Sequence, residues 1–347
     1  MVLPFGLARK NDWRTHLLRR AITVPSFLAA TVLGVFIAPA VLGTTFCVDV
    51  IRGRRQLPAT RATIFFLYFL CCETWGITAA LAIWLLTAGG RIGGSRRYMD
   101  WNFALQRIWS GALFRGALRI FSMRFETPDV TALPLPHILL VRHASTADSV
   151  LAAACIANPL RIHYAYTLKT ELLLDPCLDI VGNRIPNAFI DREATRKRLQ
   201  VERLLALVPA VRSDPRGAFL IFPEGTRFSQ DRLQRELARL VAADRSDLLR
   251  LARTFQHVLP PRTTGVYALH EALPHAPIVI LGHTGFEGAR TMGDFLRGDL
   301  IGRTIRTKTW FFTADDIPAD RNAFDLWLFE RWKELDEWIL QQRTVPT

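Results

Sequence analysis

Two long stretches near the start of the chain carry almost no charge. The first covers residues 22–48 without a charged side chain, and the second covers 62–90 with Glu73 as its only one. Each is longer than the roughly 20 apolar residues that a helix needs to cross a bilayer. Two such runs in tandem are unusual for core helices, and a cleaved signal peptide does not explain the second. The pattern predicts a two-helix membrane hairpin over 22–90.

Basic residues flank and connect the two runs. A basic segment, 1–21, precedes the first run, and Arg91, Arg96 and Arg97 follow the second. Under the positive-inside rule both ends, and the domain that follows them, should face the cytoplasm. Translocation of the connecting segment is disfavoured by Arg52, Arg54, Arg55 and Arg61. Two alternatives therefore stay open: two full spans, or a hairpin that enters one leaflet.

The segment 91–135 mixes aromatic and basic side chains. Its aromatic residues include Trp101, Phe103, Trp109 and Phe114. Such a mixture is typical of a helix in the lipid headgroup region, with aromatics toward lipid and arginines on lipid phosphates. We therefore predict an interfacial connector here, and an ordinary surface helix of the following domain is the alternative.

After residue 136 the pattern changes to short apolar runs that alternate with helical periodicity. The apolar runs are 137–141, 218–222 and 277–281, with weaker candidates at 163–168 and 305–313. Helical periodicity covers 194–211 and 230–242, and an amphipathic, Trp-rich helix over 323–341 is expected to pack on the domain. This alternation predicts an α/β domain over 136–347, with a mainly parallel or mixed sheet flanked by helices.

The overall charge and the cysteines narrow the class of protein. The 347 residues carry a formal net charge of +13, which favours a polyanionic partner. With the apolar runs, this charge favours a membrane surface and phosphorylated substrates, and no nucleic-acid partner is expected. The five cysteines are odd in number and lack CxxC spacing. They are expected to be reduced and buried, without a disulfide framework or a zinc site.

The first candidate site pairs His143 with Asp148, between an apolar strand and a predicted helix over 149–157. Open α/β sheets place their sites where strands end and helices begin. A neutral imidazole can take a proton from an alcohol while a carboxylate fixes its tautomer. Five residues along one helix would point apart, so the pair requires a loop. Alone, the spacing fits a structural histidine near a helix start equally well.

The second candidate site is the sequence Phe-Pro-Glu-Gly-Thr-Arg at 222–227, again between a strand and a helix. Gly225 permits a tight turn and a close approach to a ligand. Thr226 is expected to cap the following helix, whose N-terminus favours an anion. Arg227 offers a planar fork for a phosphate, and Glu224 is expected to orient Arg227 or the loop. A plain strand-to-helix turn with a surface arginine is the alternative.

A third candidate site, Phe-Ile-Asp-Arg at 189–192, could set a second cation, Arg192, near the same ligand. A solvated basic helix start is the alternative for this segment when it is considered alone.

Taken together and in this order, the motifs resemble those of the lysophospholipid acyltransferase family, typified by 1-acylglycerol-3-phosphate acyltransferases. His-Ala-Ser-Thr-Ala-Asp at 143–148 resembles the family's HxSxxD motif, and 189–192 and 222–227 resemble its second and third motifs. Further similarity lies in Lys169, Glu171, Leu172 and Pro176 (the K-x-E-L segment) and in a fourth motif at 277–280. The run 259–265 and the Trp-rich C-terminal segment resemble the lysocardiolipin acyltransferase branch.

Two positions depart from the family pattern. Arg142 stands where the family often has Asn before the histidine, and Asn187 stands where it usually has Gly. An inward-pointing Arg142 would disfavour the protonated form of the neighbouring imidazole. Asn tolerates left-handed backbone angles better than most residues, so the turn at 187 can persist.

The resemblance implies direct acyl transfer. His143 would deprotonate the acceptor hydroxyl, which attacks the thioester of acyl-CoA or of an acylated carrier protein (acyl-ACP), while Asp148 orients His143. The resemblance implies phosphate binding by Lys169, Arg192 and Arg227, with Glu224, Gly225 and Thr226 forming the loop. It implies no metal and no cofactor besides the acyl thioester co-substrate.

The expected reaction converts 1-acylglycerol-3-phosphate to phosphatidic acid. Acylation of another lysolipid, such as lysocardiolipin or lysophosphatidylinositol, and transacylation from a phospholipid are alternatives. A second alternative is a non-catalytic, membrane-anchored protein that binds anionic lipid. A serine hydrolase is disfavoured because the sequence has no G-x-S-x-G.

Overall fold

The α/β domain is built on a seven-stranded sheet. The computed structural model describes residues 13–344 except 129, 131, 146, 191–196 and 288–291. The strands are β1 (Arg124–Phe125), β2 (Ile138–Val141), β3 (His163–Lys169), β4 (Ala188–Ile190), β5 (Gly217–Ile221), β6 (Ile278–Thr284) and β7 (Thr304–Phe312). Their order is β1-β7-β6-β2-β5-β3-β4, and every neighbouring pair is parallel except β6 and β7. The predicted mixed α/β sheet is therefore confirmed.

The central strand β2 shows why apolar runs form this sheet. All four of its residues are buried, because helices cover both faces. Leu139 pairs with Leu220 of β5 on one side and with Val279 of β6 on the other. Since β2, β5 and β6 are parallel, the loops that follow their carboxyl ends meet at one edge of the sheet.

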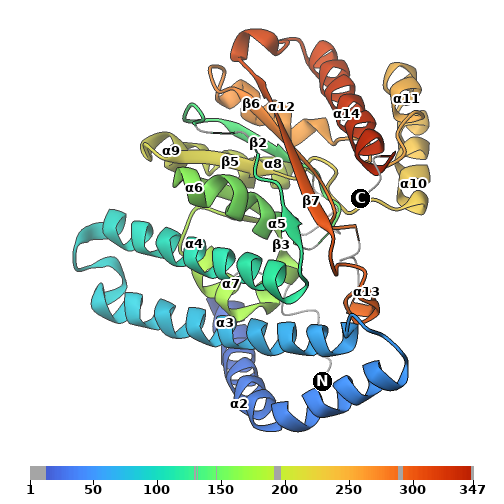
Figure 1. Ribbon diagram of the computed structural model, residues 1–347. Coiled ribbons are helices and arrows are strands. Elements are labelled where there is room, and N and C mark those ends of the chain that lie inside the picture. Colours follow the sequence, from blue (N-terminus) through green and yellow to red (C-terminus); the bar gives the residue numbers. More distant parts are fainter. Residues whose placement is uncertain are drawn as a thin grey trace.

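Helices cover the sheet in two layers (Figure 1). One face packs on α8 (Lys197–Leu205), α9 (Val208–Ser213), α10 (Gln230–Ala242), α11 (Ser246–Ala252), α12 (Thr263–Ala272) and α14 (Arg321–Thr344). The other face packs on α4 (Gly94–Ile120), α5 (Asp148–Ala152) and the π-helical turn η2 (Ala153–Ala157). The shorter remaining elements are η1 (Ala88–Gly90), α6 (Asn158–Leu160), η3 (Thr170–Leu174), α7 (Pro176–Gly182), α13 (Met292–Arg297) and η4 (Ala314–Asp316).

Two long apolar helices precede the domain, α2 (Trp13–Ile51) and α3 (Pro58–Leu86), and they pack against each other. By length and composition both are able to cross a membrane. In Figure 1, α3 lies alongside α4 while α2 lies outermost. Asp49 of α2 accepts the backbone N–H of Thr60 at 2.9 Å, which closes the turn between the two helices. The predicted boundaries at residues 21, 90 and 135 stay predictions.

Specific polar contacts attach these helices to the domain. Glu73, the single charge in the second apolar run, is fully buried and accepts the indole N–H of Trp109 at 2.8 Å. Arg19 of α2 and Asp179 of α7 form a fully buried ion pair at 2.6 Å. Arg20 also pairs with Asp179, at 3.0 Å. These contacts hold the hairpin helices against α4 and α7.

The helix α4 differs from the predicted interfacial helix. Phe103, Trp109 and Phe114 are buried in the protein, so the expectation that these aromatic residues face lipid is wrong. The helix contacts α3 on one side and the η2 region on the other, and both neighbours are apolar. Trp101 is only half-buried, and the Arg97 guanidinium lies 4.8 Å from its ring centroid.

The C-terminal helix α14 packs on the domain as predicted, with Leu328, Trp332 and Leu335 fully buried. All five cysteines are free. Cys155 and Cys177 are buried, whereas Cys47 and Cys71 on the apolar helices are exposed, so burial was wrongly expected for those two.

Candidate active site

His143 and Asp148 meet at the carboxyl end of β2. The strand ends at Val141, and α5 begins at Asp148, so the required loop separates the pair. His143 Nδ1 lies 2.9 Å from Asp148 Oδ2, and the imidazole is 16% exposed while the carboxylate is fully buried. The same oxygen accepts the backbone N–H groups of Ala144 at 2.6 Å and Ser145 at 2.8 Å. With Nδ1–H donated to Asp148, Nε2 is the nitrogen left to act as a base.

The surroundings of Asp148 keep it ionised. Burial raises the pKa of this carboxyl, but His283, His143 and the backbone N–H groups together outweigh burial and lower it below its usual value. Asp148 is therefore a carboxylate at neutral pH and can stabilise an imidazolium at His143.

Glu224 ties two loops together beneath the histidine. Its side chain is buried, and it accepts the backbone N–H of His143 at 2.8 Å and that of Leu259 at 2.9 Å. Of the two expected roles, its contacts support orientation of the loop, because each carboxylate oxygen is bonded to the backbone. Burial raises the pKa of Glu224 to about 8.

The rest of the 222–227 loop departs in one respect from the prediction. Gly225 has a φ of +66°, and a Cβ there would lie 3.3 Å from the Arg262 side chain, so glycine is required. The helix α10 begins only at Gln230, and its cap is Ser229, whose side chain accepts from the N–H of Arg232. The expected cap at Thr226 is therefore wrong, because three more residues separate it from the helix.

A cavity of about 570 Å³ adjoins these loops. Four predicted site residues line it: His143, Lys169, Gly225 and Arg227. Apolar lining comes from Leu204, Ile221, Leu240, Leu248, Val266 and Phe329, and further cations from Arg239, Arg245, Arg262 and Arg321. Arg192 lies outside the described residues.

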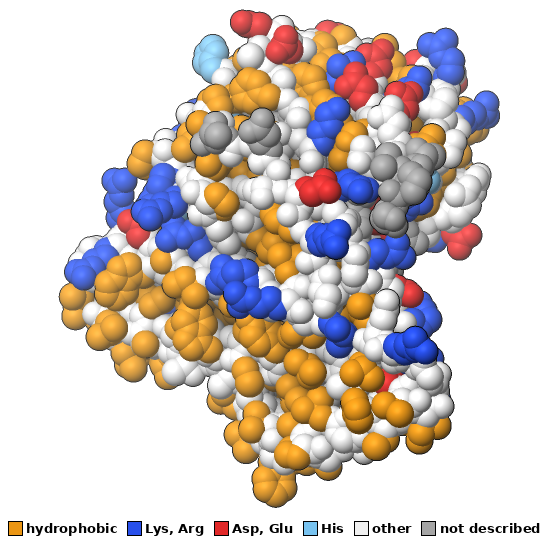
Figure 2. Space-filling view, viewed as in Figure 1, with side chains coloured by type: hydrophobic (Ala, Val, Ile, Leu, Met, Phe, Trp, Pro, Cys, Tyr) orange, Lys and Arg blue, Asp and Glu red, His pale blue; other side chains and the backbone are white. Residues whose placement is uncertain are grey.

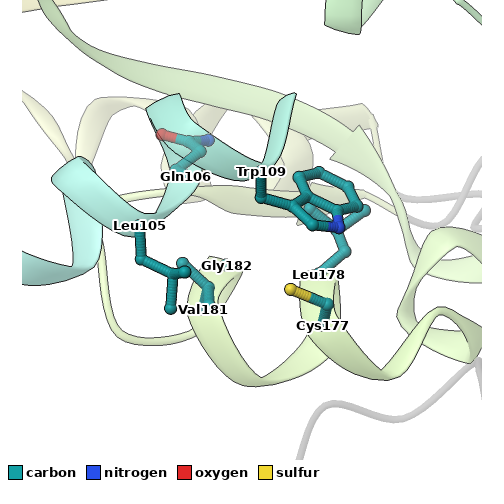
Figure 3. A pocket seen from close by; sticks show the side chains of 7 residues that line it. All are labelled: Leu105, Gln106, Trp109, Cys177, Leu178, Val181 and Gly182. Atoms are coloured by element: carbon teal, nitrogen blue, oxygen red, sulfur yellow. The ribbon is translucent and has the colours of Figure 1, made fainter. Parts of the chain in front are cut away.

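A second hollow is unrelated to the motifs. It lies between α4 and α7, where Trp109 and Leu105 approach Cys177 and Val181 (Figure 3). Its volume of about 10 Å³ is close to that of one water-sized probe, so it cannot hold a lipid or a thioester.

Arg142 turns toward β6. Its buried guanidinium pairs with Glu287 at 2.7 Å and donates to the carbonyl oxygens of His257 and His283. These three acceptors hold the buried guanidinium, and its effect on the neighbouring imidazole stays a prediction.

Two residues of the site were missed from the sequence. His283 lies at the end of β6 with Nε2 3.4 Å from Asp148 Oδ1. Arg262 lies over Gly225, is half-exposed, and is held by Glu236 at 2.9 Å. The backbone N–H of Arg262 also bonds Pro223 O at 2.9 Å, which joins the two loops. A histidine near a strand's carboxyl end was the available signal for His283, and Arg262 lay within the noted run 259–265.

Comparisons with known proteins define the class. Residues 124–294, which contain all the motifs above, match the family model described as Acyltransferase. The similarity to this family therefore lies in the α/β domain, in the part that carries His143 and Asp148. A solved structure from Thermotoga maritima, described as the 1-acyl-sn-glycerophosphate (LPA) acyltransferase PlsC, superposes with a TM-score of 0.53. The match covers 84% of this chain and 99% of that one at 13% identity, so it shows a shared fold.

None of the curated proteins matches the sequence. Within the described residues, no group of three or more His, Cys, Asp or Glu side chains is arranged to hold a metal ion. The lysocardiolipin branch stays a prediction.

Proposed function

We propose that this protein is a membrane-bound O-acyltransferase that transfers an acyl group from acyl-CoA or acyl-ACP to the hydroxyl of a lysophospholipid. One observation carries the proposal: His143 lines the cavity while its Nδ1 is bonded to the buried Asp148. That arrangement leaves Nε2 to take a proton from a hydroxyl bound in the cavity.

The chemical step needs no covalent enzyme intermediate. His143 Nε2 removes the acceptor's proton as the oxygen attacks the thioester carbonyl. The C–S bond then breaks, and the departing thiolate takes the proton back from the imidazolium. Asp148, buried and ionised, stabilises the imidazolium between these two transfers.

The cavity offers both polar and apolar binding surfaces. Lys169 and Arg227 line it, and the resemblance adds Arg192, so a phosphate ester would be held near the base. The apolar lining suits an acyl chain. We favour 1-acylglycerol-3-phosphate as the acceptor and phosphatidic acid as the product. Lysocardiolipin, lysophosphatidylinositol or a phospholipid acyl donor are the alternatives.

The chemical test uses the purified full-length protein in lipid nanodiscs. Acyl-CoA and lysophosphatidate should give phosphatidic acid, measured by mass spectrometry, and His143→Ala should abolish the product. His275→Ala, at an exposed histidine, is the matched control and should retain activity. A panel of acceptors, with and without acyl-CoA, separates the lysolipid and transacylation alternatives. Equal product from the His143→Ala variant would overturn the assignment, and salt-sensitive lipid binding without product would favour the non-catalytic alternative.

We further propose that the hairpin lies in one leaflet, with the catalytic domain on the cytoplasmic side. Apolar side chains gather over the hairpin helices at the base of the molecule (Figure 2), and Phe36 and Ile51 of α2 are more than four-fifths exposed. The helix α3 contacts α4, α7 and α13, so it lies against the domain instead of projecting from it. Its buried Glu73 would meet hydrocarbon if α3 left this position.

Cysteine labelling tests this placement. Gln56→Cys lies in the turn between α2 and α3, and Ser95→Cys lies after the hairpin; both positions are exposed. In a chain without Cys47 and Cys71, a membrane-impermeant maleimide should label both sites only after bacterial host cells are lysed. Labelling of Gln56→Cys in intact cells would instead establish two full spans.

A further inference from the structure

A second histidine contacts Asp148 on the side opposite His143. His283, on β6, is fully buried, and its Nε2 lies 3.4 Å from Asp148 Oδ1. His143 contacts the other oxygen, Oδ2, at 2.9 Å. The carboxylate therefore lies between two imidazoles, one on each oxygen.

The position of the proton on His283 follows from its partners. Nε2 also lies 3.1 Å from the backbone oxygen of Arg142, which can only accept, so Nε2 carries the proton. The other ring nitrogen, Nδ1, is buried and has no hydrogen-bond partner among the described residues. A proton on Nδ1 would make the ring a buried cation with one N–H group unpaired. Burial disfavours that cation and lowers the pKa of His283. His283 is thus neutral and donates its N–H to Arg142 O, while the same nitrogen lies 3.4 Å from Asp148 Oδ1.

The two oxygens of Asp148 are supported unequally. Oδ2 accepts from His143 and from the N–H groups of Ala144 and Ser145. Oδ1 is buried and has no hydrogen-bond partner among the described residues, and His283 Nε2 lies 3.4 Å from it. The polar N–H group of His283 therefore lies beside the carboxylate oxygen that has no hydrogen bond of its own, and it acts on that oxygen through its dipole.

We propose that His283 is a positioning residue, which fixes Asp148 and thereby sets the pH range in which His143 acts as a base. The inference rests on the proposed acyl transfer. Without the N–H donor, the carboxylate would be less stabilised as an anion and would hold the His143 imidazolium more tightly. A higher pH would then be needed to free Nε2.

Other charges around His283 offset one another. Asp148 on α5, Arg142 after β2 and Glu287 after β6 are the charged groups that act on it most strongly. Arg142 and Glu287 pair at 2.7 Å, and Arg343 of α14 lies 3.9 Å from Glu287. Phe286 contributes a ring at 6.2 Å. Asp148 is thus the anion on which the N–H of His283 acts.

Matched substitutions separate this role from mere packing. His283→Gln places an amide nitrogen near the position of Nε2, whereas His283→Leu fills similar space without a donor. His283→Asn places its amide nitrogen near Nδ1 instead. The measurement is kcat/KM against pH for the full-length protein in nanodiscs, with thermal unfolding as the check on folding.

We expect His283→Leu and His283→Asn to shift the acid limb of the kcat/KM profile to higher pH by about half a pH unit or more. In both variants kcat should fall about tenfold. His283→Gln should keep the wild-type limb. In an Asp148→Asn background the three substitutions should no longer differ, because their effect passes through the carboxylate. Should the Leu variant fail to fold, the comparison of Gln with Asn still decides the question.

The outcomes are distinguishable from failure of the proposed function. A wild-type protein that acylates no acceptor would overturn the proposed function itself. An active, His143-dependent enzyme in which the Asn and Gln variants keep the wild-type limb, or shift it equally, would overturn the role of His283 alone.

Discussion

Replacing Glu224 with Gln tests how the site is assembled. Glu224 accepts the backbone N–H of His143 at 2.8 Å and that of Leu259 at 2.9 Å, and it is buried. Gln offers one acceptor oxygen, and its NH₂ group would face the second N–H. Even a protonated carboxyl keeps a lone pair on its hydroxyl oxygen, so neither form of Glu creates this donor–donor clash.

The expected cost follows from these two bonds. Leaving one buried N–H unpaired and losing its bond destabilises the protein by about 3 kcal/mol. With an unfolding entropy of about 2.1 cal/mol/K per residue over 347 residues, Tm should fall by about 4 °C. Displacement of the His143 backbone should lower kcat/KM by about 10- to 100-fold.

The pH dependence of the folding stability gives a second, independent test of Glu224. The pKa of Glu224 in the folded protein is raised to about 8 from an ordinary 4.5, so between these values the folded chain holds a proton that the unfolded chain releases. Wild-type stability therefore falls as pH rises through this window, while Gln cannot titrate. The difference in Tm between the two proteins should narrow from pH 6 to pH 9.

Thermal unfolding and product formation, measured in nanodiscs across this pH range, provide the assay. Glu202→Gln is the matched control, since Glu202 is exposed and pairs only with the exposed Arg198 in the described structure. An unchanged Tm together with unchanged kcat/KM in Glu224→Gln would refute the idea that this carboxylate holds the two loops.

Four further substitutions have defined expectations. Asp148→Asn should lower kcat by about 10³-fold or more without raising KM, measured by product formation, because Asn does not stabilise the imidazolium. Gly225→Ala should cost about 1–2 kcal/mol in thermal unfolding and reduce turnover, since φ is +66°. Arg262→Gln should raise the KM for the acceptor several-fold with kcat retained, while Arg250→Gln, which is exposed and outside the cavity lining, should not. Arg19→Met should destabilise the protein by about 3 kcal/mol in thermal unfolding, because Asp179 loses a buried partner.

The sheet and the pairing of His143 with Asp148 could be predicted because each depends on residues that are close together in the sequence. The run at 138–141 is apolar at every position, as a central parallel strand requires, and the motifs follow their strands directly. The predicted helix at 230–242 also coincides with α10.

Features that depend on distant partners were not predictable in this way. Apolar periodicity does not distinguish a residue facing lipid from one facing a protein neighbour, so Phe103 and Trp109 were assigned to the wrong environment. His283 lies beside Asp148 only because β6 pairs with β2, and strand order is not encoded in any local pattern. The cap of α10 was misassigned because the loop after Gly225 is longer than one turn.

The attachment of the hairpin to the domain has a consequence for how this protein can be handled. Removal of residues 1–90 would leave Asp179 and the indole N–H of Trp109 without their helix partners. It would also uncover the side of α4 that now lies against α3. A version of the protein shortened in this way would therefore expose apolar side chains of α4 that α3 now covers. Solubilisation by truncation should yield aggregates, and the intact chain in detergent or nanodiscs is the practical form for crystallisation and assay.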